Sequence, residues 1–334
     1  MVPRDTSKFY LVGALVCFLQ LGCSREDDAV TVEERKPGPV ASQLVQASAL
    51  PTSQPRMQLL YLPDGGDVAP PRAPGQGLLP GPWGMPSGRC PPDMVDVRGS
   101  FCIDRYESTL LDVAEERRVS PYYHPTRHGT RNAYSRWSKQ RLEIGSETAR
   151  RVGLPSPPTW QMEEEFRVKA SSRPSSVPNG YLNLGRAREA CANAGKRLCR
   201  AEEWVRACRG EQDRKFPYGD SYVAGKCNVF RSAHPAAELH DDASVGHLDP
   251  RLNQVRVRGD RLLHKTGETP LCKSDWGADA VYDMVGNLDE WIDDSGGVFL
   301  GGFYSRNTRE GCAARISSHG PSYFDYSLGV RCCR

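Results

Sequence analysis

The sequence predicts an exported, loop-rich domain in which short helices and short strands are stapled by disulfides. Three observations support this fold class: an export signal at the N-terminus, an even set of cysteines after it, and short apolar segments separated by glycine turns and long polar stretches. The chain has 334 residues, which is room for one large domain or two small ones. Its net charge of +3 is too small to indicate a nucleic-acid partner.

The N-terminus resembles a bacterial lipoprotein signal. Arg4 and Lys8 form a positive region, and residues 9–22 form an apolar run that is too short for a membrane span of roughly 20 residues. A small residue precedes Cys23, so we expect cleavage before this cysteine and a lipid on its thiol. The pattern is imperfect because Gln20 stands where an apolar residue is usual. An ordinary secretory signal, cleaved slightly further on, is the alternative, and both export the protein.

Residues 23–89 are interpreted as a flexible tether between the signal, 1–22, and a folded domain, 90–334. The segment 24–89 holds eleven of the 26 prolines and has almost no apolar periodicity. Such a segment cannot bury enough apolar surface to offset its ordering entropy. The rest of the sequence has no apolar run of spanning length, so a lipid on Cys23 would be the membrane anchor. We therefore expect a lipid-anchored protein of the bacterial outer membrane or periplasm.

The cysteines predict disulfides rather than a metal site. Without Cys17, which lies in the signal, and Cys23, which is expected to carry lipid, ten remain, and export places them where disulfides persist. They are Cys90, Cys102, Cys191, Cys199, Cys208, Cys227, Cys272, Cys312, Cys332 and Cys333. None of them has the C-x2–4-C spacing of a zinc site, so five disulfides are expected.

The folded domain is expected to open with a hairpin. The segment that begins at Cys90 alternates apolar and polar residues on both sides of the turn at 98–100, which is typical of two short strands. Cys90 and Cys102 flank this hairpin and could pair across it.

Residues 109–180 look like an insertion, because they are polar and rich in arginine, with little alternation. A helix is expected over roughly 131–151, broken near Gly145. The segment is basic through Arg127, Arg131, Arg136, Lys139, Arg141, Arg150 and Arg151. A solvated helix face explains this charge, and a surface for an anionic partner, such as a polysaccharide or lipid phosphate, is the alternative.

Two more helices are expected over 184–194 and 200–209. In each, apolar residues recur at helical spacing and a glycine follows the last turn. Cys191 and Cys208 should therefore point inward from these two helices.

The segment YDMVGNLDEW at 282–291 combines large apolar residues with closely spaced acids around one glycine. A solvated loop has no need of so many large apolar groups. We interpret it as a buried strand and turn whose oxygens face one point, where a cation is expected. A second glycine turn follows at 301–304.

Seven short motifs, in order along the chain, resemble the formylglycine-generating enzyme family, whose members are also called sulfatase-modifying factors. They are GKRLCRAEEW (195–204), FPYGD (216–220), Cys227-Asn228, YDMVGNLDEW (282–291), Gly301-Gly302, CAAR (312–315) and GVRCC (329–333). The similarity runs from roughly Cys90 to the C-terminus, without the segment 109–180. It implies a loop-rich α+β fold with a C-type-lectin-like core, held by calcium and disulfides.

The resemblance also implies two disulfides, Cys208–Cys312 and Cys191–Cys332. The cysteines left over could then pair as Cys199–Cys333 and Cys227–Cys272, although a sequence does not fix connectivity.

Calcium is the cofactor that the resemblance implies. The ligands of one family site correspond to Asp283, the carbonyls of Gly286 and Leu288, and Glu290. Those of a second site correspond to Asn228 and the carbonyl of Val229, with Asp242 as a further candidate. Mixed carboxylate and carbonyl oxygens suit this hard cation. The alternative is that Asp283 and Glu290 form ion pairs with arginines such as Arg315 or Arg331.

The sequence departs from the family at the catalytic site. The family enzyme needs two cysteines, C-x4-C, after a Gly-Gly-Ser turn, because two thiolates hold Cu(I). Here Phe303 stands in place of that serine and Arg306 in place of the first cysteine, and the second cysteine has no clear counterpart. Asp289 replaces a tryptophan beside the active site. Copper, and copper-dependent oxidation, are therefore not expected.

We expect a non-catalytic binding module for an envelope protein or polysaccharide. Its binding face would carry Phe303, Tyr304, Arg306, Arg309 and Tyr323, with Phe324 and Tyr326 beside them. Rings stack on ligands and guanidinium groups grip carboxylates or sulfates. The alternative for the aromatic residues is that half of them belong to the core. The alternative functions are an oxidase that converts a sulfatase cysteine to formylglycine, and a purely structural envelope protein.

Overall fold

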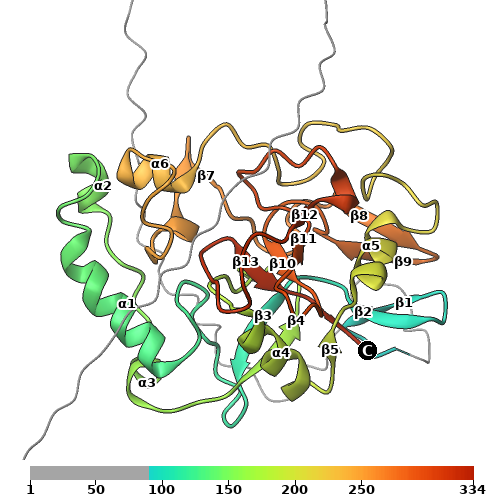
Figure 1. Cartoon of the computed structure of the whole chain (residues 1–334), viewed down its shortest axis with the longest axis horizontal. Helices are drawn as coiled ribbons and strands as arrows, with labels where there is room; N and C mark the ends of the chain where they lie inside the picture. The colour runs from blue at the N-terminus through green and yellow to red at the C-terminus, as the bar shows by residue number, and fades with distance from the viewer. Residues whose placement is uncertain (1–89) are drawn as a thin grey trace, which may run out of the picture. The chain divides into compact units, whose positions relative to one another are not determined.

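The computed structural model describes residues 90–334, which consist of short helices and short strands joined by long loops (Figure 1). This confirms the predicted loop-rich α+β fold class. The predicted signal, the lipidation site Cys23 and the predicted tether lie outside the described residues. Within 90–334, no helix is both long enough and apolar enough to cross a membrane.

The first sheet joins the start of the domain to its end. Its strand order is β1 (Met94–Val97), β2 (Phe101–Asp104), β14 (Cys332–Cys333) and β5 (Arg197–Leu198), all antiparallel. The predicted hairpin is therefore confirmed, and positive φ angles at Arg98 and Gly99 form its turn.

The second sheet lies at the centre of the domain. Its order is β12 (Arg315–Ile316), β11 (Phe299–Leu300), β10 (Asp289–Trp291) and β13 (Leu328–Val330), and only the β10–β13 pair is parallel. The segment 282–291 is thus a strand at its end and a turn before it. That turn needs positive φ angles at Asp283, Gly286 and Asn287.

The segment 109–180 is not a polar insertion throughout, because paired strands form its two ends. Strand β3 (Ser108–Asp112) pairs with β4 (Val168–Ser172), and all five residues of β3 are buried. A strand buried on both faces does not alternate, which is why the sequence did not reveal it.

The helix expected over 131–151 is present as two helices, α1 (Arg127–Gln140) and α2 (Glu147–Arg151), with the break at Gly145 as predicted. Helix α1 begins earlier than expected because the hydroxyl of Thr126 accepts a hydrogen bond from the backbone N–H of Gly129 and caps the helix.

The other predicted helices are confirmed as α4 (Leu184–Asn193) and α5 (Ala201–Arg209), and each buries its cysteine. The remaining elements are α3 (Thr159–Glu163), α6 (Pro235–His240), η1 (Leu252–Gln254), β6 (Arg256–Val257), β7 (Asp260–Arg261), β8 (Lys273–Trp276), β9 (Asp279–Tyr282) and η2 (Gly311–Ala313).

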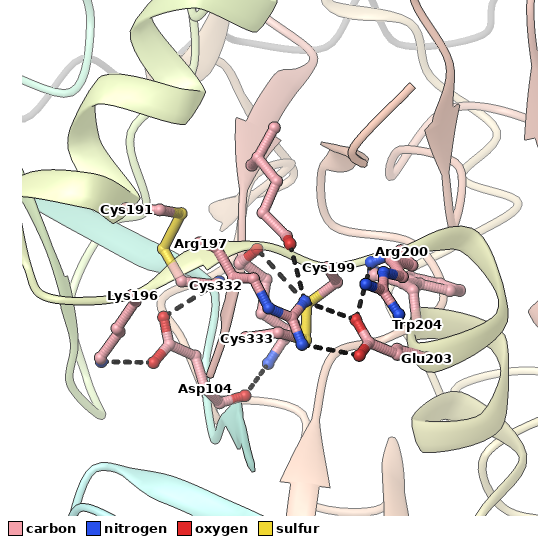
Figure 2. The surroundings of a disulfide bond; sticks show 12 residues. Asp104, Cys191, Lys196, Arg197, Cys199, Arg200, Glu203, Trp204, Cys332 and Cys333 are labelled. Atoms are coloured by element: carbon pink, nitrogen blue, oxygen red, sulfur yellow. Dashed lines mark hydrogen bonds and ion pairs between the residues drawn. A yellow bond between two sulfur atoms is a disulfide. The ribbon is translucent and has the colours of Figure 1, made fainter. Parts of the chain in front are cut away.

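All ten cysteines of the described residues form disulfides. The pairs are Cys90–Cys102, Cys191–Cys332, Cys199–Cys333, Cys208–Cys312 and Cys227–Cys272, as the sequence and the family resemblance suggested. Figure 2 shows the adjacent cysteines of β14 bonded to two different segments, α4 and the stretch between β5 and α5. The end of the domain is thereby fixed to its middle.

Candidate functional site

The first candidate site lies where the family places its catalytic turn, between Asp289 and Arg306. Asp289 is the first residue of β10, and its carboxylate is buried. Nη1 of Arg306 lies 2.9 Å from Oδ1 and 2.8 Å from Oδ2 of Asp289. The backbone N–H of Gly302 donates to the same Oδ1 at 3.0 Å. The two side chains that depart from the family pattern are therefore an ion pair.

Burial sets the electrostatics of this pair. The net effect is a pKa of about 7 for Asp289, and burial is the largest cause of the rise. The charge of Asp325 adds to the rise, and the Arg306 guanidinium partly opposes it. The Arg306 side chain is 30 % exposed, and its guanidinium lies over the Phe303 ring at 5.1 Å. The site thus presents a cation to solvent and keeps its carboxylate inside.

Most of the predicted aromatic face belongs to the core, which corrects the expectation from sequence. Phe303 and Tyr304 are buried and pack with Tyr326, because the glycine turn at 301–302 directs the chain inward. The Tyr304 hydroxyl donates to Oδ1 of Asn253 inside this cluster.

The part of the predicted face that reaches solvent is Arg306, Arg309 and the half-buried Tyr323 and Phe324. Beside them, the hydroxyl of Tyr323 donates to Oδ2 of Asp325 at 2.7 Å, and the backbone N–H of Ser327 donates to Oδ1 at 2.8 Å. The face is therefore smaller and more polar than the sequence indicated.

The second candidate site is the buried cluster around Arg331, which includes the predicted calcium ligand Glu290. The Arg331 guanidinium contacts both Glu290 oxygens at 2.9–3.1 Å, and it donates to the carbonyls of Asp104 and Tyr282. The Trp204 indole N–H donates to Oε2 of Glu290 at 2.6 Å. Glu290 therefore adopts the ion-pair alternative, and its oxygens are already engaged.

Asp283 lies beside this ion pair with a carboxylate that the sequence did not single out, Glu107. Asp283 accepts from the backbone N–H of Gly267 at 2.7 Å. Glu107 accepts from Nδ2 of Asn287 at 2.5 Å and from the backbone N–H of Leu288 at 3.0 Å. Burial raises the pKa of Asp283 to about 7, and burial followed by the charges of Asp283 and Glu290 raises that of Glu107 well above its usual value.

The cluster thus holds three buried carboxyl groups, from Glu107, Asp283 and Glu290, around the single cation Arg331. A further cation near Asp283 and Glu107 would relieve this excess of negative charge, so the residues fit calcium there better than at Glu290. Calcium binding stays a prediction. No group of three or more His, Cys, Asp or Glu within 90–334 has an arrangement that could hold a metal ion.

Side chains of the second predicted calcium site form hydrogen bonds with other protein groups. Oδ1 of Asn228 accepts from Nε of Arg231, and its Nδ2 donates to the carbonyl of Leu262 and to Asn287. Asp242 is exposed and bonds to Ser244. A guanidinium therefore already bonds the Asn228 oxygen, and the second calcium site, with the Val229 carbonyl, stays a prediction.

The two predicted calcium segments nevertheless lie against each other. The backbone N–H of Asn287 donates to the Asn228 carbonyl at 2.9 Å, and a side chain at Gly286 would run into that carbonyl. The glycine is therefore required for this close approach, whether or not a cation binds.

The Asp283 carboxyl makes a prediction about pH. Its folded pKa is raised from 3.8 to about 7, so the folded state keeps a proton that the unfolded state has lost, and stability falls as pH rises through this window. In EDTA, Asp283→Asn should stabilise the protein by about 2–4 kcal/mol at pH 8 and leave it unchanged near pH 4. Urea unfolding at both pH values measures this.

Added calcium distinguishes Asp283 as a calcium ligand from Asp283 as a buried carboxyl group that only titrates. If the cation binds there, calcium raises the melting temperature of the wild type at pH 8 and not that of Asp283→Asn. A wild-type melting temperature unmoved by both EDTA and calcium would refute the calcium prediction.

A third buried pair, Asp104 with Lys196, was also missed from sequence. Nζ of Lys196 lies 2.5 Å from Oδ1 of Asp104 and 2.5 Å from Oδ2 of Asp93. Burial raises the pKa of Asp104 to about 6, and Lys196 lowers it. Figure 2 shows this pair beside the Cys191–Cys332 disulfide, with the backbone N–H of Cys332 donating to Asp104. The pair fixes β14, and Lys196 and Asp93 also line a surface pocket.

Comparison with known proteins gives one family match. A family model described as "Sulfatase-modifying factor enzyme 1-like domain" matches residues 79–334. No curated protein matches the chain.

Several solved structures are similar in fold. CarF is 15% identical with a TM-score of 0.35, over 70% of this chain and 86% of that one. PvdO from Pseudomonas aeruginosa is 15% identical with a TM-score of 0.34, over 70% and 80%. The P3c variant of the major tropism determinant is 14% identical with a TM-score of 0.35, over 73% and 52%.

Proposed function

The chain belongs to the family of sulfatase-modifying factor enzyme 1-like domains, and from this premise we propose that residues 90–334 form a non-catalytic binding module. The five disulfides are consistent with an exported protein. In this proposal the module is held at a bacterial envelope by a lipid on Cys23, and it binds an envelope protein or polysaccharide. An active oxidase that makes formylglycine in a sulfatase peptide is the competing function.

The observation that carries the proposal is the ion pair between Asp289 and Arg306. Cu(I) chemistry of the family type needs two thiolates at this position. Here a guanidinium stands at the first thiolate position and is bonded to a buried carboxylate. Every cysteine of the described residues is in a disulfide, so this part of the chain supplies no thiolate elsewhere. The residues present do not fit copper.

The same ion pair suits a binding role. One nitrogen of the Arg306 guanidinium bonds Asp289, whereas its Nε and Nη2 donate to no residue within 90–334. A guanidinium carries five N–H donors in a planar fork that matches a carboxylate or a sulfate. Because Asp289 and Phe303 fix one side of the fork, little rotamer entropy is lost when a ligand binds the other side. Tyr323 lies close enough to interact with both Arg306 and Asp289, and we propose that the free side of the fork binds an acidic group on the ligand.

The double variant Asp289→Asn/Arg306→Gln tests this role without leaving a buried charge unpaired. The full-length protein should retain an envelope component in pull-downs, and the double variant should bind it at least about tenfold more weakly, since a charge-assisted bidentate contact is lost. Surface plasmon resonance on the captured component measures the affinity. The matched control is Arg258→Gln, an exposed arginine elsewhere in the domain, which should bind as the wild type does.

The competing function predicts a different result. A sulfatase-motif peptide incubated with the full-length protein, copper and oxygen should keep its cysteine, as read by mass spectrometry, while an active family enzyme converts it. Conversion by the wild type, lost in Asp289→Asn/Arg306→Gln, would establish the oxidase and overturn the binding module.

A further inference from the structure

Helix α1 presents one continuous polar face to solvent. Its exposed residues follow helical spacing and so lie on one side of the helix: His128, Arg131, Asn132, Ser135, Arg136 and Lys139. Figure 1 shows α1 along the edge of the described chain, between α2 and α3. The face is therefore accessible over the length of the helix, and from residue 131 to 139 it extends for about 12 Å.

The charge on this face is positive and has no acidic counterpart. Helix α1 contains no Asp or Glu. Among the described residues, Arg131 and Lys139 form no ion pair, and the side chain of Arg136 donates to the neutral amide of Gln140 at 2.9 Å. Solvated helix faces commonly place acids three or four residues from such cations. Within α1 itself no acid does so; Glu143 lies four residues after Lys139 but beyond the end of the helix, and Glu165 pairs with Arg127 rather than with the three cations of the face. The three cations are thus free to pair with a ligand.

The opposite side of α1 holds the helix in place. Trp137 is buried and its ring lies 5.6 Å from that of His240 in α6. Nε2 of Gln161 in α3 donates to the hydroxyl of Thr130 at 2.9 Å, and the hydroxyl of Thr130 donates to the carbonyl of His124. The exposed cations therefore project from a fixed helix, which reduces the entropy lost on binding.

The composition of the face favours a carbohydrate over a membrane. Helices that lie in a membrane surface bury large apolar side chains in it, and none of the six exposed residues has one. Instead Asn132, Ser135 and His128 place amide, hydroxyl and imidazole groups among the cations. Such groups exchange hydrogen bonds with sugar hydroxyls.

We propose that the outer face of α1 binds an acidic polysaccharide. Arg131, Arg136 and Lys139 pair with its carboxylates or sulfates, and the polar groups between them bond its hydroxyls. No residue of this face belongs to the Arg306 site, so the inference goes beyond the proposed function and does not depend on it.

The test compares the full-length wild type with Arg131→Gln/Arg136→Gln/Lys139→Gln. The probes are polygalacturonate, dextran sulfate, uncharged dextran, and vesicles that contain phosphatidylglycerol. The wild type should bind at least one of the two acidic polymers, less tightly as salt is added, and should not bind dextran. The triple variant should bind about 10- to 100-fold more weakly at physiological ionic strength, because each cation near a polyanion contributes up to about 1 kcal/mol. Its melting temperature should be unchanged.

The matched control removes the same charge from other exposed positions, as Arg173→Gln/Lys215→Gln/Arg258→Gln. This control should bind the acidic polymer within about twofold of the wild type. Equal weakening of both triple variants would show that net charge, and not α1, attracts the polymer. Absence of binding to both polymers by the wild type, or tighter binding to the vesicles, would also overturn the proposal. Binding by Asp289→Asn/Arg306→Gln should match the wild type, so failure here is distinct from failure of the proposed function.

Discussion

Removing the two disulfides of β14 together should cost about 6–7 kcal/mol of unfolding free energy, although removing either one should cost only about 2–3 kcal/mol. The first variant is Cys191→Ala/Cys332→Ala, the second is Cys199→Ala/Cys333→Ala, and the third combines them. Each variant removes both partners of a disulfide, so no free thiol remains within 90–334. Urea unfolding without reductant measures all three. The combined variant is expected to be largely unfolded at 25 °C, since a domain is commonly stable by only about 5–15 kcal/mol.

The two losses are not additive because the two disulfides close nearly the same loop of the unfolded chain. Each joins residues far apart in sequence, with separations of 141 and 134. The Cys208–Cys312 disulfide lies inside both loops and shortens them to roughly 30–40 residues, so either crosslink without the other constrains the unfolded chain by about 4 kcal/mol. When the first is present, the second closes only the eight steps from Cys191 to Cys199 and the single step from Cys332 to Cys333. A loop of about nine residues is worth about 2.6 kcal/mol.

The Cys90–Cys102 disulfide provides the control, because its loop of 12 residues does not overlap the other two. Cys90→Ala/Cys102→Ala should cost about 3 kcal/mol whether or not one β14 disulfide is missing. If the two β14 variants were instead additive with each other, the shared-loop argument would be wrong and local packing at Cys332 and Cys333 would account for their effect.

The elements that could be predicted from sequence are those whose signal is local. The hairpin at 98–100, the helix α4 and the helix α5 each carry their own turn residues and apolar spacing within a dozen residues. Two disulfides were predicted from the family resemblance and one from the hairpin that its cysteines flank. The last two came from pairing the remaining cysteines. Strand β3 was missed because it is buried on both faces, so that STLLD shows no alternation in a polar stretch.

The candidate sites were harder to predict, since their contacts span large distances in sequence. Glu107 follows a hairpin and resembles a solvated acid, yet it accepts from the backbone of Leu288, 181 residues away. The ion pair of Asp289 with Arg306 was visible only as two departures from the family pattern. Phe303 and Tyr304 looked like a ligand face because the inward direction of their turn is set by the tertiary structure. Whether a side chain is buried depends on the whole fold, and it cannot be predicted from a short motif alone.

Arg331→Met should cost about 3–5 kcal/mol at neutral pH, because a buried carboxylate loses its cation. The Arg331 side chain is fully buried, and it bonds Glu290 and two backbone carbonyls, those of Asp104 and Tyr282. Methionine fills a similar volume and supplies no donor. Urea unfolding at pH 8 measures the loss. The control is Arg315→Met, whose side chain is half exposed and lies 4.0 Å from Asp294, and it should change stability by less than about 0.5 kcal/mol.

The deficit of Arg331→Met should also grow with pH, and this separates charge from packing. The Arg331 charge lowers the pKa of Glu107 and of Asp283, so without it their folded pKa values rise further above those of the unfolded chain. The folded variant then holds protons that the unfolded chain releases, and stability is lost as pH rises through that wider window. Near pH 4 roughly half or more of these carboxyl groups are protonated even in the unfolded chain, so the two states differ least in bound protons and the deficit should be smallest. A deficit that is equal at pH 4 and pH 8 would mean that Arg331 acts through its volume and its bonds to the two carbonyls. Replacing Glu290 with Gln in the same variant should restore only part of the loss, because Glu107 and Asp283 would still lack their shared cation.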